Sequence, residues 1–171
     1  RVRALALAVV AALVFAVAGW AGTARQGAST SLLRVASTAS VTTWDPIKSL
    51  STEVAYMANI YEPLIYANPP GASKPFRAGL ATTWGRSKDG KTWTFRLRQG
   101  VKFQDGTRLT SDAVKASIEA AAKRGGASFI WAALDKVETP NDWTVVIDLK
   151  YPAPITLIAA AEYGAWIVCP S

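Results

Sequence analysis

The side chains that could carry chemistry in this chain are few and widely spaced. Glu53 and Glu62 are candidates for a pair of carboxylates, the groups that general acid–base catalysis often uses. They lie nine residues apart, at one end of a predicted helix and in a turn, so nothing in the spacing pairs them. Cys169 is the single cysteine, and there is no histidine. This removes the commonest general base, the commonest metal ligand and every histidine-based triad, so we predict no catalytic site, no metal site and no cofactor.

The composition is that of an ordinary folded domain with a mild basic excess. Of the 171 residues 50% are hydrophobic and 18% are charged, which favours a folded core over disorder. The formal net charge is +7, and +5 without Arg1 and Arg3. The basic residues occur in runs of at most two, whereas nucleic-acid-binding proteins concentrate them. We therefore expect a generic soluble surface and no nucleic-acid partner.

Residues 1–21 have the layout of a secretory signal peptide. Two arginines precede an uncharged run, Ala4 to Gly22, and Ala16-Val17-Ala18 fits a cleavage site. An uncleaved membrane anchor is the alternative, because the run is barely long enough to span a bilayer. Either way we expect the rest of the chain to lie outside the cytoplasmic membrane. Trp20 stands where a lipobox would place its lipid-bearing cysteine, so no lipid anchor is expected, and residues 22–31 are predicted to be a flexible leader.

The elements that must position any site include an aromatic hairpin. Its arms are predicted at about 82–87 and 91–98, joined by a turn that contains Asp-Gly, the strongest short hairpin signal. The second arm alternates large apolar and polar residues, and its apolar members are Trp93, Phe95 and Leu97. Full burial of one such side chain stabilises by roughly 1.5–3 kcal/mol, so we expect all three in the core. The intervening Arg96 and Arg98 are expected to be solvated, as are Lys102 and Arg108 farther along.

A helix and a second hairpin follow. Thr110 is a good N-cap for a helix that ends before Gly125. The predicted inner stripe of this helix consists of Val114, Ser117, Ile118 and Ala121. The second hairpin is predicted to turn at residues 140–142. Its second arm is predicted to point inward with Trp143, Val145, Ile147 and Leu149, and outward with Thr144, Asp148 and Lys150.

Shorter elements are predicted before the first hairpin. Residues 32–37 suit a buried strand, residues 51–60 a helix and residues 64–66 another strand. A polar loop after the first strand ends in Trp-Asp-Pro, and we expect Trp44 to pack beneath the Asp-Pro turn.

Several of these motifs occur in the order found in a known family. The block DGKTWTFRLRQGVKFQDGTRLTSDAVKAS (89–117) is the most specific, because it joins a hairpin arm, an Asp-Gly turn and a Thr-capped helix. The shorter matching motifs are WDP (44–46), NIYEPLIY (59–66), GLATTW (79–84) and VETPNDWTVVIDLKYPAP (137–154). Over about residues 32–170 the chain resembles the N-terminal part of bacterial family 5 solute-binding proteins. These are extracytoplasmic receptors of ABC importers for peptides, nickel chelates and some sugars.

The resemblance implies a mixed α/β fold of the type II periplasmic-binding-protein kind, and no enzymatic activity. Residues 32–50 would be the start of the large ligand-binding lobe. Residues 51–171 would be most of a small α/β subdomain, truncated at its C-terminus. Family members run to several hundred residues, and the lobe that closes over the ligand would be missing here. We therefore expect this piece to bind its ligand poorly when it is alone. The implied partners are a peptide or similar small solute and the permease of the importer.

The resemblance also implies a set of ligand-binding candidates. The segment that matches the ligand-lining exit of the first strand consists of Ser40, Val41, Thr42 and Thr43. Short hydroxyl side chains and free backbone groups suit hydrogen bonding to an extended peptide, although an ordinary loop is the alternative. Tyr61 and Trp131 are further candidates for the cleft, with core packing as the alternative for both aromatic residues.

A different class of function fits the same sequence. A small exported interaction domain could use its basic surface to bind anionic lipid or cell-wall polymer. Salt-sensitive binding to anionic vesicles would be its signature.

Overall fold

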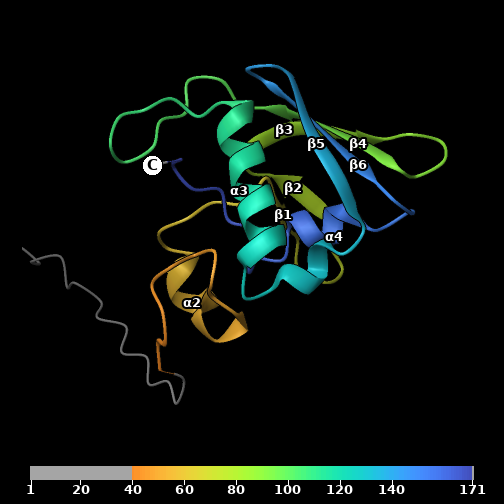
Figure 1. Ribbon diagram of the computed structural model, residues 1–171. Helices are drawn as coiled ribbons and strands as arrows, with labels where there is room; N and C mark the ends of the chain where they lie inside the picture. The colour runs from red at the N-terminus through yellow and green to blue at the C-terminus, as the bar shows by residue number, and fades with distance from the viewer. Residues whose placement is uncertain (1–39, 171) are drawn as a thin grey trace, which may run out of the picture. The chain divides into compact units, whose positions relative to one another are not determined.

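Two antiparallel hairpins build the four-stranded sheet that dominates the structure. The computed structural model describes residues 40–170, so the predictions of a signal peptide, a leader and a strand over 32–37 lie outside the described residues. The strands are β3 (Ala81–Arg86), β4 (Thr92–Leu97), β5 (Leu134–Asn141) and β6 (Thr144–Leu149). Their order in the sheet is β3-β4-β6-β5, so β4 and β6 join the two hairpins (Figure 1). Both predicted hairpins are confirmed.

The inner face of the sheet holds the core. Phe95 of β4 lies opposite Val145 of β6, and Trp93 lies opposite Ile147, so the alternating apolar residues of both hairpins meet on one face. The buried members of these two strands are Trp93, Phe95, Leu97, Val145, Ile147 and Leu149. The predicted burial of the aromatic arm is therefore confirmed, and Arg96 and Arg98 are exposed as expected.

The outer face differs from the prediction at one residue. Thr144 lies opposite Arg96 on this face, but it is only 5% exposed and not solvated as predicted. The guanidinium of Arg96 accounts for this, because its Nη1 donates a 3.3 Å hydrogen bond to Oγ1 of Thr144 and covers it. Asp148 is half-buried on the same face and accepts a hydrogen bond from the hydroxyl of Thr92.

Helix α3 (Ser111–Arg124) packs against the inner face of the sheet (Figure 1). Its predicted stripe of Val114, Ser117, Ile118 and Ala121 is buried, which confirms the helical spacing. Thr110 has the extended backbone of an N-cap, but its side chain makes no capping hydrogen bond. The turn between β5 and β6 fixes the helix start instead. Ser111 donates its N–H to the carbonyl of Asp142 and its hydroxyl to the carbonyl of Asn141.

The remaining elements are short. Strands β1 (Ile65–Ala67) and β2 (Phe76–Ala78) form a separate two-stranded sheet. The helix predicted over 51–60 is shorter than expected, since it consists of one turn each of η1 (Ser51–Glu53) and α2 (Val54–Met57). The chain turns after Met57 and reaches Pro63, a residue that cannot continue a helix. The C-terminal part holds η2 (Ser128–Trp131) and α4 (Ile155–Ala159). None of the helices between Ser40 and Pro170 combines the length and apolarity needed to cross a bilayer.

Candidate ligand-binding site

The candidate segment, Ser40–Thr43, has no regular secondary structure and is tied to η1 through one carboxylate. Oε1 of Glu53 accepts hydrogen bonds from the backbone N–H and the hydroxyl of Thr42, at 3.1 and 2.6 Å. Oε2 accepts from the backbone N–H of Leu50 at 3.1 Å and from the hydroxyl of Thr52 at 2.8 Å. The carboxylate therefore holds the start of η1 and the candidate segment together.

The hydrogen bonds at Glu53 determine its protonation state. Donation from the hydroxyl of Thr42, then from Thr52 and from the N–H of Thr42, lowers the pKa of Glu53 from 4.5 to about 2, although burial opposes this shift. A general base needs a pKa near the working pH, so Glu53 is unsuited to that role at neutral pH. Glu62 is exposed and forms no pair with it.

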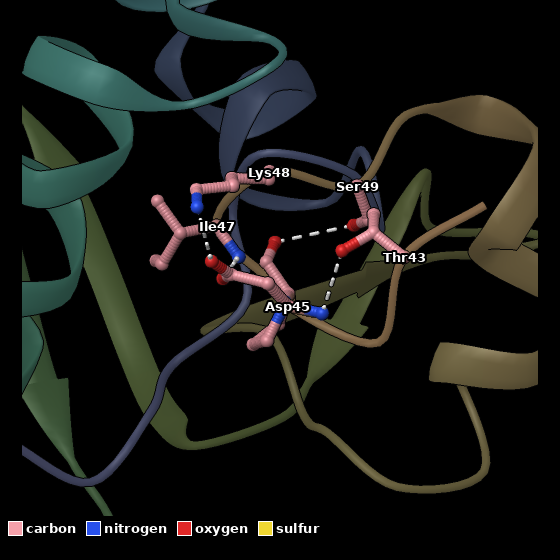
Figure 2. Close-up of polar contacts among 6 residues, drawn as sticks. Thr43, Asp45, Ile47, Lys48 and Ser49 are labelled. Atoms are coloured by element: carbon pink, nitrogen blue, oxygen red, sulfur yellow. Dashed lines mark hydrogen bonds and ion pairs between the residues drawn. The ribbon is translucent and has the colours of Figure 1, made fainter.

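The residues after the candidate segment form a turn around Asp45 (Figure 2). The N–H of Asp45 donates to Oγ1 of Thr43 at 3.0 Å, and Oδ1 of Asp45 accepts from the N–H of Ile47 at 2.9 Å. The carbonyl of Asp45 accepts from the N–H of Ser49 at 2.9 Å, and Lys48 forms an ion pair with its carboxylate at 3.7 Å. The turn is thus closed by its own polar groups.

The prediction that Trp44 packs beneath this turn is wrong. Its side chain is 59% exposed, because Ile47 is the apolar residue that the turn buries. The indole ring meets the ring of Tyr56 edge-on, with ring centroids 6.3 Å apart and an interplanar angle of 76°. Trp44 therefore presents an aromatic surface to solvent directly beside Thr43.

The two aromatic candidates have partners other than the candidate segment. Trp131 is 3% exposed, and its indole N–H donates to the carbonyl of Gly164 at 2.6 Å. Tyr61 is half-buried, with its ring centroid 6.3 Å from that of Trp166. Within residues 40–170 no hydrogen bond or ring contact joins either aromatic residue to Ser40–Thr43. The structure does not gather the six candidates into one cavity, and their roles in ligand binding remain predictions.

A cavity of about 100 Å³ lies beside Tyr61, the one of the six candidates that lines it. Its walls come from residues 60–62, 101–104 and 167–169, together with Leu80 and Leu109. Pockets that enclose a small-molecule ligand typically measure about 300–1,000 Å³, so this cavity could hold a single side chain but not a peptide.

The free thiol of Cys169 also lines this cavity. Its Sγ lies 3.3 Å from Oδ2 of Asp105 and 3.3 Å from the hydroxyl of Thr107. The hydrogen bond from the hydroxyl of Thr107 is the main cause of the lowered pKa of Asp105.

In the part of the chain that the structure describes, no group of three or more His, Cys, Asp or Glu residues could hold a metal ion.

Sequence reasoning did not identify the anchoring role of Glu53. A usable signal was present, because Glu53 stands three residues after Leu50, the residue that precedes η1. A glutamate at that spacing reaches back to the first N–H of a helix in a capping box. No pattern in the local sequence predicts that its other carboxylate oxygen accepts hydrogen bonds from Thr42.

Comparison with known proteins connects this architecture to a family. A family model described as "Bacterial extracellular solute-binding proteins, family 5 Middle" matches residues 76–168, a range that includes both hairpins and α3. The "Probable D,D-dipeptide-binding periplasmic protein DdpA" of Escherichia coli (strain K12) is 35% identical over 114 residues, which are 65% of this chain and 22% of that protein.

Two further likenesses agree with this match. The "Nickel-binding periplasmic protein" of Escherichia coli (strain K12) is 41% identical over 61 residues, which are 36% of this chain and 11% of that protein. The solved structure of MoaA from A. tumefaciens R10 in complex with mannopinic acid is 33% identical, with a TM-score of 0.66. The matched region covers 76% of this chain and 28% of the MoaA chain. This chain therefore spans roughly a quarter or less of the curated relatives that it matches.

Proposed function

Because the chain belongs to the bacterial extracellular solute-binding proteins of family 5, we propose that it is part of the solute receptor of an ABC importer. It would capture a peptide or similar small solute outside the cytoplasmic membrane and release it unchanged to the permease. The observation that carries the proposal is the family match over residues 76–168. The mixed α/β fold agrees with it, since the solved relatives of this fold are periplasmic binding proteins.

The proposed solute is small and polar. The relatives are named for a D,D-dipeptide and for nickel, and one solved relative holds mannopinic acid. In the proposed site the hydroxyl of Ser40 and those backbone groups of Ser40–Thr43 that are not bonded to Glu53 would bind the solute by hydrogen bonds, as in the capture of an extended peptide. Tyr61 is retained as a further proposed contact, whereas Trp131 is not, because it is 3% exposed and its indole N–H is bonded to Gly164. No catalytic residue is proposed.

The proposed division of the chain follows the same reasoning. Residues 32–50 would belong to the ligand-binding lobe, and residues 51–171 would form the small α/β subdomain beside it. The four-stranded sheet and α3 fall entirely within the second range, which supports this boundary. The relative DdpA is named a periplasmic protein, and the basic, then apolar, N-terminal segment supports export of this chain as well. Trp20 in place of a cysteine supports a form without a lipid anchor, whose membrane contact is limited to the N-terminal segment.

The proposal competes with binding to an anionic lipid or polymer. Three exposed arginines bear on this alternative, because each lies over a different aromatic ring. Arg77 lies 4.0 Å from the centroid of Tyr66, Arg86 lies 5.8 Å from that of Trp93, and Arg108 lies 5.3 Å from that of Trp143. This arrangement divides the basic charge among separate positions, whereas a polyanion site needs it concentrated. Arg108 is exposed, as expected from the sequence, and its guanidinium also lies over the ring of Trp143.

Isothermal titration calorimetry tests the proposed function. The chain, and any longer polypeptide that its gene encodes, would be titrated with D-alanyl-D-alanine, a nickel chelate and mannopinic acid. We expect saturable heat for at least one solute and recovery of that solute unchanged. No heat from any solute, together with salt-sensitive binding to anionic vesicles, would favour the alternative function instead.

A further inference from the structure

We propose that Glu53 is the positioning residue of the candidate segment, Ser40–Thr43, because its carboxylate holds Thr42 against the start of η1 by two hydrogen bonds. This inference rests on the proposed function, in which the candidate segment contacts the solute. Glu53 itself touches no solute in this scheme and acts through Thr42.

The burial of Glu53 makes its hydrogen bonds obligatory. The side chain is among the largest fully buried ones and is 1% exposed. A buried charge is strongly unfavourable unless it is paired or hydrogen-bonded. Among the described residues no lysine or arginine lies within ion-pair distance of it, since the ion pairs there involve Asp45, Glu119, Glu138 and Asp148. The four donors alone stabilise the charge, and Thr42 supplies two of them.

The candidate segment depends on this one contact. Within residues 40–170 the hydrogen bonds from Thr42 to Glu53 are the only ones that connect Ser40, Val41 or Thr42 to the rest of the chain. Thr43 is bonded within its own turn, through Asp45. Among residues 40–170 the backbone groups of Ser40 and Val41 have no hydrogen-bond partner, while Thr42 fixes where they lie. Preorganisation of this kind lowers the conformational entropy that binding would otherwise cost.

A glutamine cannot replace Glu53 at this position. Each carboxylate oxygen accepts one backbone N–H and one hydroxyl, from Thr42 on one side and from Leu50 and Thr52 on the other. The hydroxyl groups can rotate to accept from an amide, but a backbone N–H can only donate. Whichever way the amide of glutamine is turned, its NH₂ group faces the N–H of Thr42 or that of Leu50. Glu53→Gln therefore breaks either the anchor of the candidate segment or the start of η1.

Two hydroxyl deletions separate these roles. Thr42→Val and Thr52→Val each remove one hydroxyl donor from Glu53, but only Thr42 lies in the candidate segment. Hydrogen–deuterium exchange of the full chain, read by NMR, would report the amide of Thr42 or of its replacement, which donates to Glu53. A hydrogen bond to a charged group is strong enough that we expect at least about tenfold faster exchange of this amide in Thr42→Val. Thr52→Val should leave this amide at the wild-type rate, and Thr42→Ser should restore protection because it keeps the hydroxyl donor.

A second experiment measures the affinity of the same variants for one solute, the dipeptide Ala-Ala. If it binds, we expect about tenfold weaker affinity in Thr42→Val and wild-type affinity in Thr52→Val. Unchanged exchange of the amide at position 42 in both Thr42→Val and Glu53→Gln would overturn the inference. Exchange that rises in Thr42→Val supports the anchor even when no solute binds, in which case only the proposed function fails. If Glu53→Gln does not fold, Thr42→Val and its serine control decide the question.

Discussion

The indole N–H of Trp131 donates a 2.6 Å hydrogen bond to the carbonyl oxygen of Gly164, and this bond joins η2 to the segment after α4. Both residues are buried, so each polar group depends on the other for its partner. The contact explains why a tryptophan occupies this position, since no other apolar side chain of that size carries an N–H donor.

Trp131→Phe is expected to lower the free energy of unfolding by about 1–3 kcal/mol, because the buried carbonyl of Gly164 loses its donor. Urea unfolding followed by circular dichroism measures this. Trp44→Phe is the matched control, since Trp44 is 59% exposed, and it should change stability by no more than about 0.5 kcal/mol. Equal losses in the two variants would contradict the assignment of Trp131 to the core.

Gly164→Ala is expected to destabilise the chain for two reasons. The residue has φ +67, a backbone conformation that costs a residue with a side chain about 1–2 kcal/mol. A Cβ atom there would also lie 2.8 Å from Cβ of Ala127. Gly85→Ala is the control, because a Cβ there meets nothing within 4 Å and the backbone is not left-handed. Thermal unfolding should show a lowered midpoint temperature for Gly164→Ala and no lowering of that temperature for Gly85→Ala.

Phe95→Ala is expected to lower the free energy of unfolding by about 3–5 kcal/mol, since the side chain is 0% exposed and lies in the centre of the sheet. Arg98 is exposed and directly follows β4, so Arg98→Ala serves as the control. Its free energy of unfolding should lie within about 0.5 kcal/mol of that of the wild type. A small effect of Phe95→Ala in denaturant titration would show that the aromatic arm is not core.

The stability that Glu53 contributes should depend on pH. Its pKa is lowered on folding, from 4.5 to about 2, so the contribution is complete above pH 4.5 and declines as the pH falls from 4.5 toward 2. The difference in unfolding free energy between wild type and Glu53→Gln isolates this effect from other carboxylates. We expect the difference to shrink on acidification. A difference that stays constant between neutral pH and about pH 2 would show that the charge is not what matters.

The sheet and its main helix could be predicted because their signals are local. Alternation in 91–98 and an Asp-Gly turn define one hairpin, and apolar spacing with a glycine stop defines α3. The errors arose where a side-chain contact that the alternation or the motif does not encode decides the outcome. Thr144 is buried by Arg96, which is 48 positions away in the chain. Trp44 is exposed because Ile47, and not the tryptophan, occupies the interior of the turn.

The candidate site was less predictable than the fold. The family resemblance suggested Ser40–Thr43, and Ser51-Thr52-Glu53 was expected to begin a helix, but nothing local indicated that the two segments are joined. Thr42 and Glu53 are eleven positions apart with an irregular turn between them. Only the geometry of that turn brings the carboxylate to the threonine. The placement of Trp131 against Gly164 depends in the same way on contacts 33 positions apart.

The strand order β3-β4-β6-β5 sets a sequence of events for folding. Each hairpin closes over a short turn, and such closure takes roughly 1–10 μs. The seam between β4 and β6 pairs residues 48 to 56 positions apart and has to wait until the intervening chain, including α3, is compact. Refolding should therefore be slowed by substitutions that loosen either turn, because the turns form first, whereas substitutions along the late-forming seam should mainly hasten unfolding.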